Sequence, residues 1–199
     1  MTSTETYRPV ATLTGAEKVD RAAAVRRALR SLVAEHGFHG SSMSAVAKQA
    51  GVATGTAYVH YESKEALVFA TYLEVKRELG TAAMSDVDPS ASFHERFLKM
   101  WFGIYRHLQL EPERARFLVQ VDSSPFARQA HQLAMSAYDD PIMAEATPET
   151  LALLAPLPLD IIYELGLAPA IRLAASGIEL DETTLGLIAN ACWRAMTTA

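Results

Sequence analysis

Residues 41–67 read SSMSAVAKQAGVATGTAYVHYESKEAL and combine small side chains with hydroxyl-bearing and basic ones. Helical spacing predicts two short helices, at about 43–50 and 54–60, with Ser42 as the N-cap of the first. Gly51 lies between them, where a tight turn needs the left-handed backbone conformation that glycine adopts readily. Two short helices joined by such a turn are typical of a helix-turn-helix, whose second helix enters the major groove of DNA.

The small residues of this stretch have a geometric explanation. Ala47 is expected to face the crossing helix, where a larger side chain would separate the pair, and Val52 and Ala57 are expected to fill the small core. Gly55, near the start of the second short helix, would let the backbone approach a duplex closely. The alternative interpretation is an ordinary helical hairpin held together by small-residue packing.

Carboxylates are absent from this part of the chain, since no Asp or Glu occurs between Glu35 and Glu62. A surface free of negative charge suits phosphate, which hydroxyl and basic side chains bind by hydrogen bonds. His60 taken alone is equally typical of a solvated surface histidine. We predict a DNA-binding surface made of Ser42, Thr54, Gly55, Thr56, Tyr58, Val59, His60 and Lys64.

The formal net charge of -5 argues against a nucleic-acid partner, but it hides an asymmetry. Residues 1–66 hold eight Lys or Arg and six Asp or Glu, whereas the remainder holds ten and seventeen. Only the N-terminal third therefore suits a polyanion. No apolar run reaches the ~18 residues that cross a bilayer, and the N-terminus lacks a signal pattern, so we expect a cytoplasmic protein without membrane contact.

The rest of the chain has helical periodicity and no convincing strand, which predicts an all-α fold. A first helix begins near Glu17, and a long fourth helix runs from about Ser63 to Gly80. Further helices are expected at 90–109, 112–122, 125–144, 149–155, 158–176 and 181–197, with Pro169 beginning or bending one of them. We expect a disordered arm (1–16), a three-helix DNA-binding domain (17–66) and a helical bundle for ligand binding and dimerisation (67–199).

The bundle is rich in aromatic and Met residues with few polar groups, a composition expected of a small-molecule pocket. A solid core of the same residues is the alternative. We hypothesise that an apolar ligand with one or two polar atoms binds between these helices. The predicted ligand-binding residues are Trp101, Tyr105, Phe117, Val121, Phe126, His131, Met135 and Tyr138.

Other polar residues were weighed for chemistry. We interpret Arg21, Arg26, Arg27 and Arg30 on the first helix as a solvated face, with contact of one of them to backbone phosphate as the alternative. Asp122, Ser123 and His131 have the residue types of a catalytic triad, but their spacing carries no information. The single Cys192 excludes an internal disulfide, and no zinc-ligand pattern is present, so the sequence predicts neither an enzyme nor a cofactor or metal site.

Residues 41–67 resemble the tetracycline repressor (TetR) family of bacterial transcription regulators. The family's pattern T-x-x-x-I-A-x-x-A-G-V-S-x-G-T-x-Y-x-H-F-x-x-K-x-x-L is matched at Ala47, Ala50, Gly51, Val52, Gly55, Thr56, Tyr58, His60, Lys64 and Leu67. The resemblance covers about residues 18–79, and a weaker one covers the C-terminal GIELDETTLGLIANACWRAM. Two positions depart from the pattern, since Ala53 replaces the usual Ser or Thr and Val59 replaces a longer side chain.

The resemblance implies that Tyr58, His60 and Lys64 hold phosphates and that Thr56 touches phosphate or a base edge. It also implies that Ala53, Thr54, Gly55 and Val59 face the groove. The last two long helices would pair with those of a second copy, so that the homodimer binds a pseudo-palindromic double-stranded DNA operator. A small, largely apolar effector would release this repressor. Alternatives are an effector-independent or activating regulator and, in another class, a catalytic helical bundle.

Overall fold

The computed structural model describes residues 15–137 and 140–198, which are all-α and include no strand. Most of the arm expected over residues 1–16 lies outside the described residues, and Gly15 opens the first helix. The helices are α1 (Gly15–His36), α2 (Met43–Gln49), α3 (Thr54–His60), α4 (Lys64–Met84), α5 (Phe93–Leu110), α6 (Pro112–Asp122), α7 (Ala127–Met135), α8 (Pro148–Leu151), α9 (Leu159–Gly166), α10 (Ala168–Ser176) and α11 (Glu182–Met196). Single turns of 3-10 helix, η1 (Phe38–Gly40) and η2 (Met143–Glu145), complete the set.

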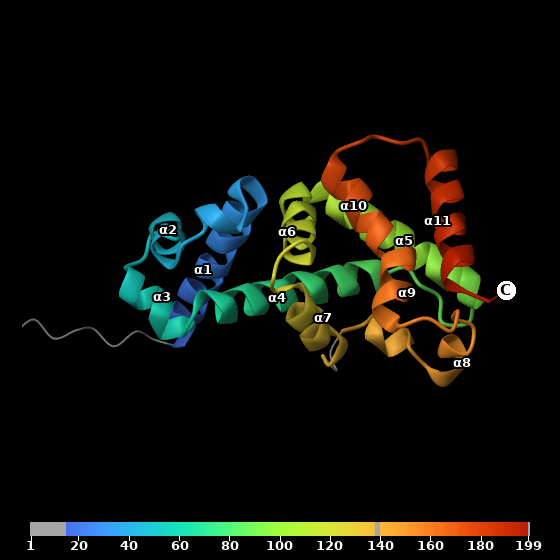
Figure 1. Cartoon of the computed structure of the whole chain (residues 1–199), viewed down its shortest axis with the longest axis horizontal. Coiled ribbons are helices and arrows are strands. Elements are labelled where there is room, and N and C mark those ends of the chain that lie inside the picture. Colours follow the sequence, from blue (N-terminus) through green and yellow to red (C-terminus); the bar gives the residue numbers. More distant parts are fainter. Residues whose placement is uncertain (1–14, 138–139, 199) are drawn as a thin grey trace, which may run out of the picture.

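Helices α1, α2 and α3 form a head at one end of the molecule (Figure 1). The hydroxyl oxygen of Ser42 accepts the backbone N–H of Ala45 at 3.2 Å, which caps α2 as predicted. Gly51 adopts a φ of +68°, so the predicted left-handed turn is confirmed. Ala57 is completely buried among the three helices.

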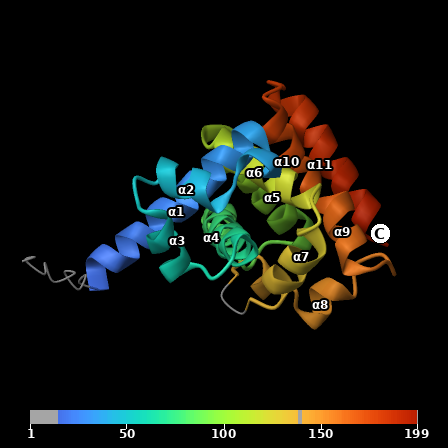
Figure 2. The same cartoon turned by 60° about the vertical axis from the view of Figure 1, so that its left-hand side comes forward.

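Helix α4 leads from the head into the bundle, where α5, α6 and α7 pack against it (Figure 1, Figure 2). Its N-cap is Ser63, whose hydroxyl oxygen accepts the N–H of Ala66 at 3.0 Å. The predicted end at Gly80 is wrong, because α4 continues to Met84. Gly80 has a packing role instead, since a Cβ there would lie 2.8 Å from Oδ1 of Asp140.

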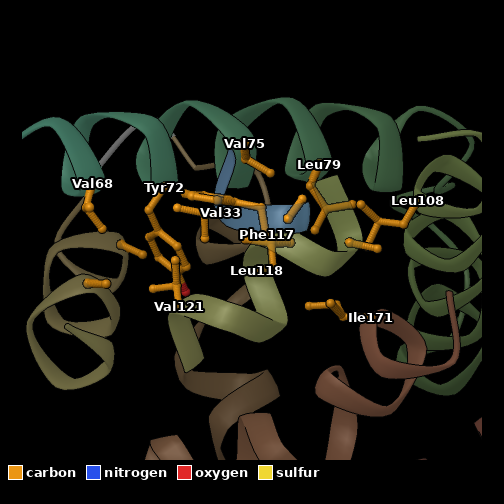
Figure 3. Close-up of a cluster of buried hydrophobic side chains, with 14 of the residues drawn as sticks. Val33, Val68, Tyr72, Val75, Leu79, Leu108, Phe117, Leu118, Val121 and Ile171 are labelled. Atoms are coloured by element: carbon orange, nitrogen blue, oxygen red, sulfur yellow. The ribbon is translucent and has the colours of Figure 1, made fainter. Parts of the chain in front are cut away.

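One hydrophobic core runs through the head and the bundle without interruption. Figure 3 shows Val33 of α1 close to Val75 and Leu79 of α4 and to Phe117 of α6. All four side chains are essentially inaccessible to solvent. Because the core is close-packed, a helix that moves inside the bundle would push against side chains of the head.

The predicted helix 125–144 is wrong in its second half, because α7 ends at Met135. Pro141 lacks the N–H that a helix needs and disfavours helical geometry at Asp140. The Oδ1 atom of Asp140 accepts the N–H of Ile142 at 2.9 Å, which forms a local turn instead. Residues 140–142 therefore form a turn and do not continue α7.

The predicted helix 158–176 is two helices, α9 and α10, which meet at Leu167. Pro169 stands in the first turn of α10, which confirms that it begins a helix. The predicted helix 149–155 is only the single turn α8, because Leu154 instead pairs with Thr197 in an antiparallel bridge. None of the described helices has the length and apolar character needed to cross a membrane.

Candidate DNA-binding surface and ligand cavity

The outer surface of α3 carries the side chains expected to contact DNA. Tyr58 is 50% exposed and Val59 is 72% exposed, although both are large and partly or wholly apolar. Thr54 is also exposed, whereas Thr56 and His60 are half-buried. A large apolar side chain so open to solvent is consistent with contact to a partner, and in the major groove it suits the methyl group of thymine.

Gly55 lies exposed in the first turn of α3, and packing within the chain does not require a glycine there. A Cβ built at this position would meet no atom within 4 Å. Its backbone is helical, with no positive φ. The position is therefore free for close approach of an external group to the backbone.

Helix α3 begins without a side-chain cap. Ala53 occupies the N-cap position in an extended conformation and has no hydroxyl to accept a backbone N–H. A Ser or Thr at this position would add such an acceptor. The departure from the family pattern noted in the sequence thus removes one hydroxyl from this surface.

Two of the predicted phosphate ligands already make contacts inside the head. Ser42 is exposed, but its hydroxyl caps α2. The Nζ atom of Lys64 donates to the carbonyl oxygen of Phe38 at 2.6 Å and lies 5.6 Å from the centre of the Phe38 ring. Partial burial lowers the pKa of Lys64. Lys64 therefore also holds the start of α4 against η1.

The interpretation of the α1 arginines as a solvated face is wrong for Arg26 and Arg30. Arg26 forms a two-pronged ion pair with Glu74 of α4, at 2.7 and 2.9 Å, and donates to the hydroxyl of Tyr61 at 2.6 Å. The Nε atom of Arg30 donates to Glu113 of α6 at 2.7 Å. These pairs fasten the head to two helices of the bundle, whereas Arg27 remains exposed.

A cavity of about 260 Å³ lies within the bundle. This size is near the lower end of small-molecule pockets, which span roughly 300–1,000 Å³. Helices α4, α5, α7 and α9, the segment 140–146 and the C-terminal Met196 contribute to its wall. The wall is mainly apolar, with Phe97, Met100, Ala134, Met135, Ile142, Met143, Leu154, Ile162 and Leu167 among its members.

The predicted ligand-binding residues fall into separate places. His131 and Met135 line the cavity. Trp101, Tyr105, Phe117 and Val121 belong instead to the tightly packed core, where almost none of their surface is accessible. The ring of Phe126 lies between the head and α4, next to Phe38 and Phe69, and Tyr138 lies outside the described residues. Among the described residues of the predicted set, only His131 and Met135 therefore line the cavity.

Polar groups meet at the α4 side of the cavity. The Nζ atom of Lys76 lies 4.9 Å from the centre of the Tyr163 ring, and Nε2 of His131 is 2.8 Å from Oδ1 of Asp122. Burial lowers the pKa of Lys76, while the negative charges of Asp140 and Asp122 oppose the shift. Burial also raises the pKa of Tyr163, so its phenol stays protonated at neutral pH.

Sequence reasoning missed the contributions of α4 and α9 to this wall. One signal was present, because Lys76 follows Tyr72 by four residues on the face that also carries Leu79 and Ala83. A lysine on an apolar helical face is unusual, since such side chains are almost never buried unpaired. Tyr163 gave no comparable signal among the apolar residues of α9.

Comparison with known proteins agrees with this architecture. Residues 25–71 match the family described as bacterial regulatory proteins, tetR family, and residues 92–197 match the tetracyclin repressor-like C-terminal domain. An HTH-type transcriptional regulator of Haemophilus influenzae is 29% identical over 183 residues, which cover 90% of this chain and 97% of that protein.

Solved structures give the same result for the fold. A TetR-family transcriptional regulator of Haemophilus influenzae superimposes with a TM-score of 0.70 at 28% identity, and one of Marinobacter aquaeolei with 0.74 at 23% identity. In both cases the match covers 92% of this chain and 99% of the other. Because the two matched sequence ranges together span most of the chain, this protein belongs to the TetR family and is a helix-turn-helix DNA-binding transcriptional regulator, not an enzyme.

Proposed function

We propose that this regulator is a repressor that a small, largely apolar effector releases from its operator. Its DNA-binding surface consists of Thr54, Gly55, Thr56, Tyr58, Val59 and His60 on α3 together with Ser42 and Lys64. The exposure of Tyr58 and Val59 and the open space at Gly55 support this assignment. Repression of genes on the chromosome would place the protein in the cytoplasm.

The operator is expected to be pseudo-palindromic, because we propose a homodimer formed through α10 and α11. Leu187 of α11 is 67% exposed, which suits an apolar interface with a second copy. Two heads related by a two-fold axis would read half-sites about 34 Å apart, or a multiple of that distance. Leu187→Glu is expected to give monomers in light scattering, while Leu110→Glu, at an exposed residue of α5, keeps the dimer.

The observation that carries the effector proposal is the double role of α7. Ala134 and Met135 of this helix line the cavity, and Phe126 at its N-cap contacts Phe38 of the head. An effector that binds better to the form with misaligned heads must weaken DNA binding by the same factor by which DNA weakens effector binding. The coupling path is short, because a single helix touches both places.

Selection of bound duplexes from a random pool would identify the operator, and fluorescence anisotropy would then measure affinity with and without candidate effectors. We expect a preferred sequence with two-fold symmetry and a loss of affinity when the cavity is occupied. Thr54→Ala should change the preferred sequence more than the overall affinity. Occupancy of the cavity without any change in DNA affinity would instead favour an effector-independent regulator.

A further inference from the structure

Lys76 brings a positive charge to the wall of an apolar cavity. Only 9% of its surface is accessible. Within residues 15–137 and 140–198, Nζ has no hydrogen-bond acceptor and no ion-pair partner. It lies over the face of the Tyr163 ring, 4.9 Å from the ring centre. Three ammonium donors are thus left without an acceptor in the part of the chain that the structure describes.

A largely buried ammonium without an acceptor is energetically unfavourable, because it has lost most of its water and gained no hydrogen bond. The attraction of an aromatic face recovers only part of this loss. An oxygen anion placed in the cavity would supply the missing acceptor, and with it an opposite charge hydrogen-bonded directly to the ammonium. The cavity wall therefore offers an anion a hydrogen-bonding partner at Lys76.

The carboxylates around the cavity are already engaged. Asp140 accepts the N–H of Ile142, Asp122 accepts a hydrogen bond from His131, and Glu145 is paired with Arg96. Asp160 is exposed to solvent. Among the described residues, Lys76 is consequently the one buried charged residue of the cavity that lacks a hydrogen-bonded partner.

Lys76 also borders a second, polar cleft, which includes Arg26 and Glu74 of the head-to-bundle contact. The side chain of Lys76 therefore contributes to the walls of both the apolar cavity and this charged cleft. This junction suits a molecule that is apolar along most of its length and charged at one end. The apolar part would occupy the space between Phe97, Met100 and Ile162.

We propose that the effector is an anionic amphiphile, an aliphatic chain that ends in a carboxylate, with its head group paired to Nζ of Lys76. This inference rests on the effector role proposed above and specifies the chemistry of the ligand. A cationic head group would be repelled by Lys76. A neutral ligand would leave the ammonium without a directly hydrogen-bonded anion.

Isothermal titration with three probes of equal chain length, each below its micelle concentration, tests this proposal. The probes are decanoate, decanol and decyltrimethylammonium. We expect one decanoate per chain, bound at least tenfold more tightly than either of the others. Lys76→Met should weaken decanoate binding at least tenfold while decanol binding is kept or improved, and Lys99→Met, at an exposed lysine of α5, should change neither.

Equal affinity for decanoate and decanol, or decanoate binding that is insensitive to Lys76→Met, would overturn the anionic head group and leave the effector role standing. Absence of binding by all three probes to a protein that still binds its operator would also overturn the ligand class. Decanoate that binds through Lys76 but leaves operator affinity unchanged would support the ligand class and contradict the effector role. Circular dichroism of Lys76→Met verifies that the variant is folded.

Discussion

The ring of Phe126, at the start of α7, lies 5.0 Å from the ring of Phe38 in the DNA-binding head, measured between ring centres. Phe126 also meets Phe69 of α4 edge-on at 6.2 Å. The carbonyl oxygen of Phe38 accepts a hydrogen bond from Nζ of Lys64. A shift of α7 caused by occupancy of the cavity would therefore reach the segment that positions α2 and the start of α4.

Phe126→Ala is predicted to uncouple the cavity from the head. Loss of the ring removes contacts with Phe38 and Phe69, so a movement of α7 has less effect on the head. The effector lowers the logarithm of the operator affinity, and we expect this decrease to be less than half as large in the variant as in the natural protein. Fluorescence anisotropy with and without ligand measures this quantity, and affinity of the ligand itself should change little.

A matched control is Phe102→Ala, which removes a half-buried ring of α5 that contacts Trp101. It is expected to lower stability without changing the coupling. Equal loss of coupling in both variants would mean that the effect follows from general destabilisation.

Arg26→Leu is predicted to destabilise the folded protein by about 2–3 kcal/mol, because it leaves the partly buried Glu74 and Tyr61 without their charged donor. Arg27→Leu, at the exposed neighbouring position, should change the free energy of unfolding by no more than about 0.5 kcal/mol. Urea denaturation of both variants gives the comparison. Similar values for the two would show that the Arg26–Glu74 pair adds no net stability.

The contrast between Arg26 and Arg27 shows where sequence reasoning succeeds. Ser42, Gly51 and Pro169 act on their own chain neighbours, so their roles were predictable from the local sequence. The partners of Arg26 are 35 and 48 residues away, and no local pattern indicates which arginine they will meet.

The sequence predicted the apolar composition of the cavity wall but not which residues form it. Trp101 and Met135 belong to the same apolar patterns in the sequence, yet one fills the core and the other lines an open space. The difference depends on how closely helices approach. Two close contacts between helices require glycine. A Cβ at Gly103 would lie 2.9 Å from the backbone of Ala83, and a Cβ at Gly166 would clash with Met196. These distances arise from the whole packing arrangement.

Gly55→Ala is predicted to separate folding from DNA binding. The new methyl group would meet no atom of residues 15–137 and 140–198 within 4 Å, and alanine favours a helix over glycine by up to about 1 kcal/mol. Thermal stability should therefore be kept or raised. If the backbone of α3 approaches the duplex at this point, operator affinity should fall at least tenfold. Gln49→Ala, at an exposed end of α2, serves as the control. Unchanged affinity of the Gly55 variant would move the duplex away from this part of α3.

The burial of Lys76 predicts a pH-dependent stability difference between the protein and its Lys76→Met variant. Burial lowers the pKa of Lys76 in the folded state below its ordinary value of 10.5, so folding disfavours the charged form of this side chain. As pH rises through the lowered pKa, the folded form loses this proton while the unfolded chain keeps it until about 10.5, so the stability of the natural protein rises in that window.

Lys76→Met should therefore be more stable than the natural protein at pH 7, with an advantage that shrinks toward pH 10.5. Tyr72 and Tyr163, whose pKa values are raised by burial, are present in both proteins, so to first order their contributions cancel in the difference. Urea denaturation of both proteins at pH 7 and at about pH 10 measures this difference in the free energy of unfolding. A variant less stable than the natural protein at pH 7 would show that attraction by Asp140 and Asp122 outweighs the loss of hydration.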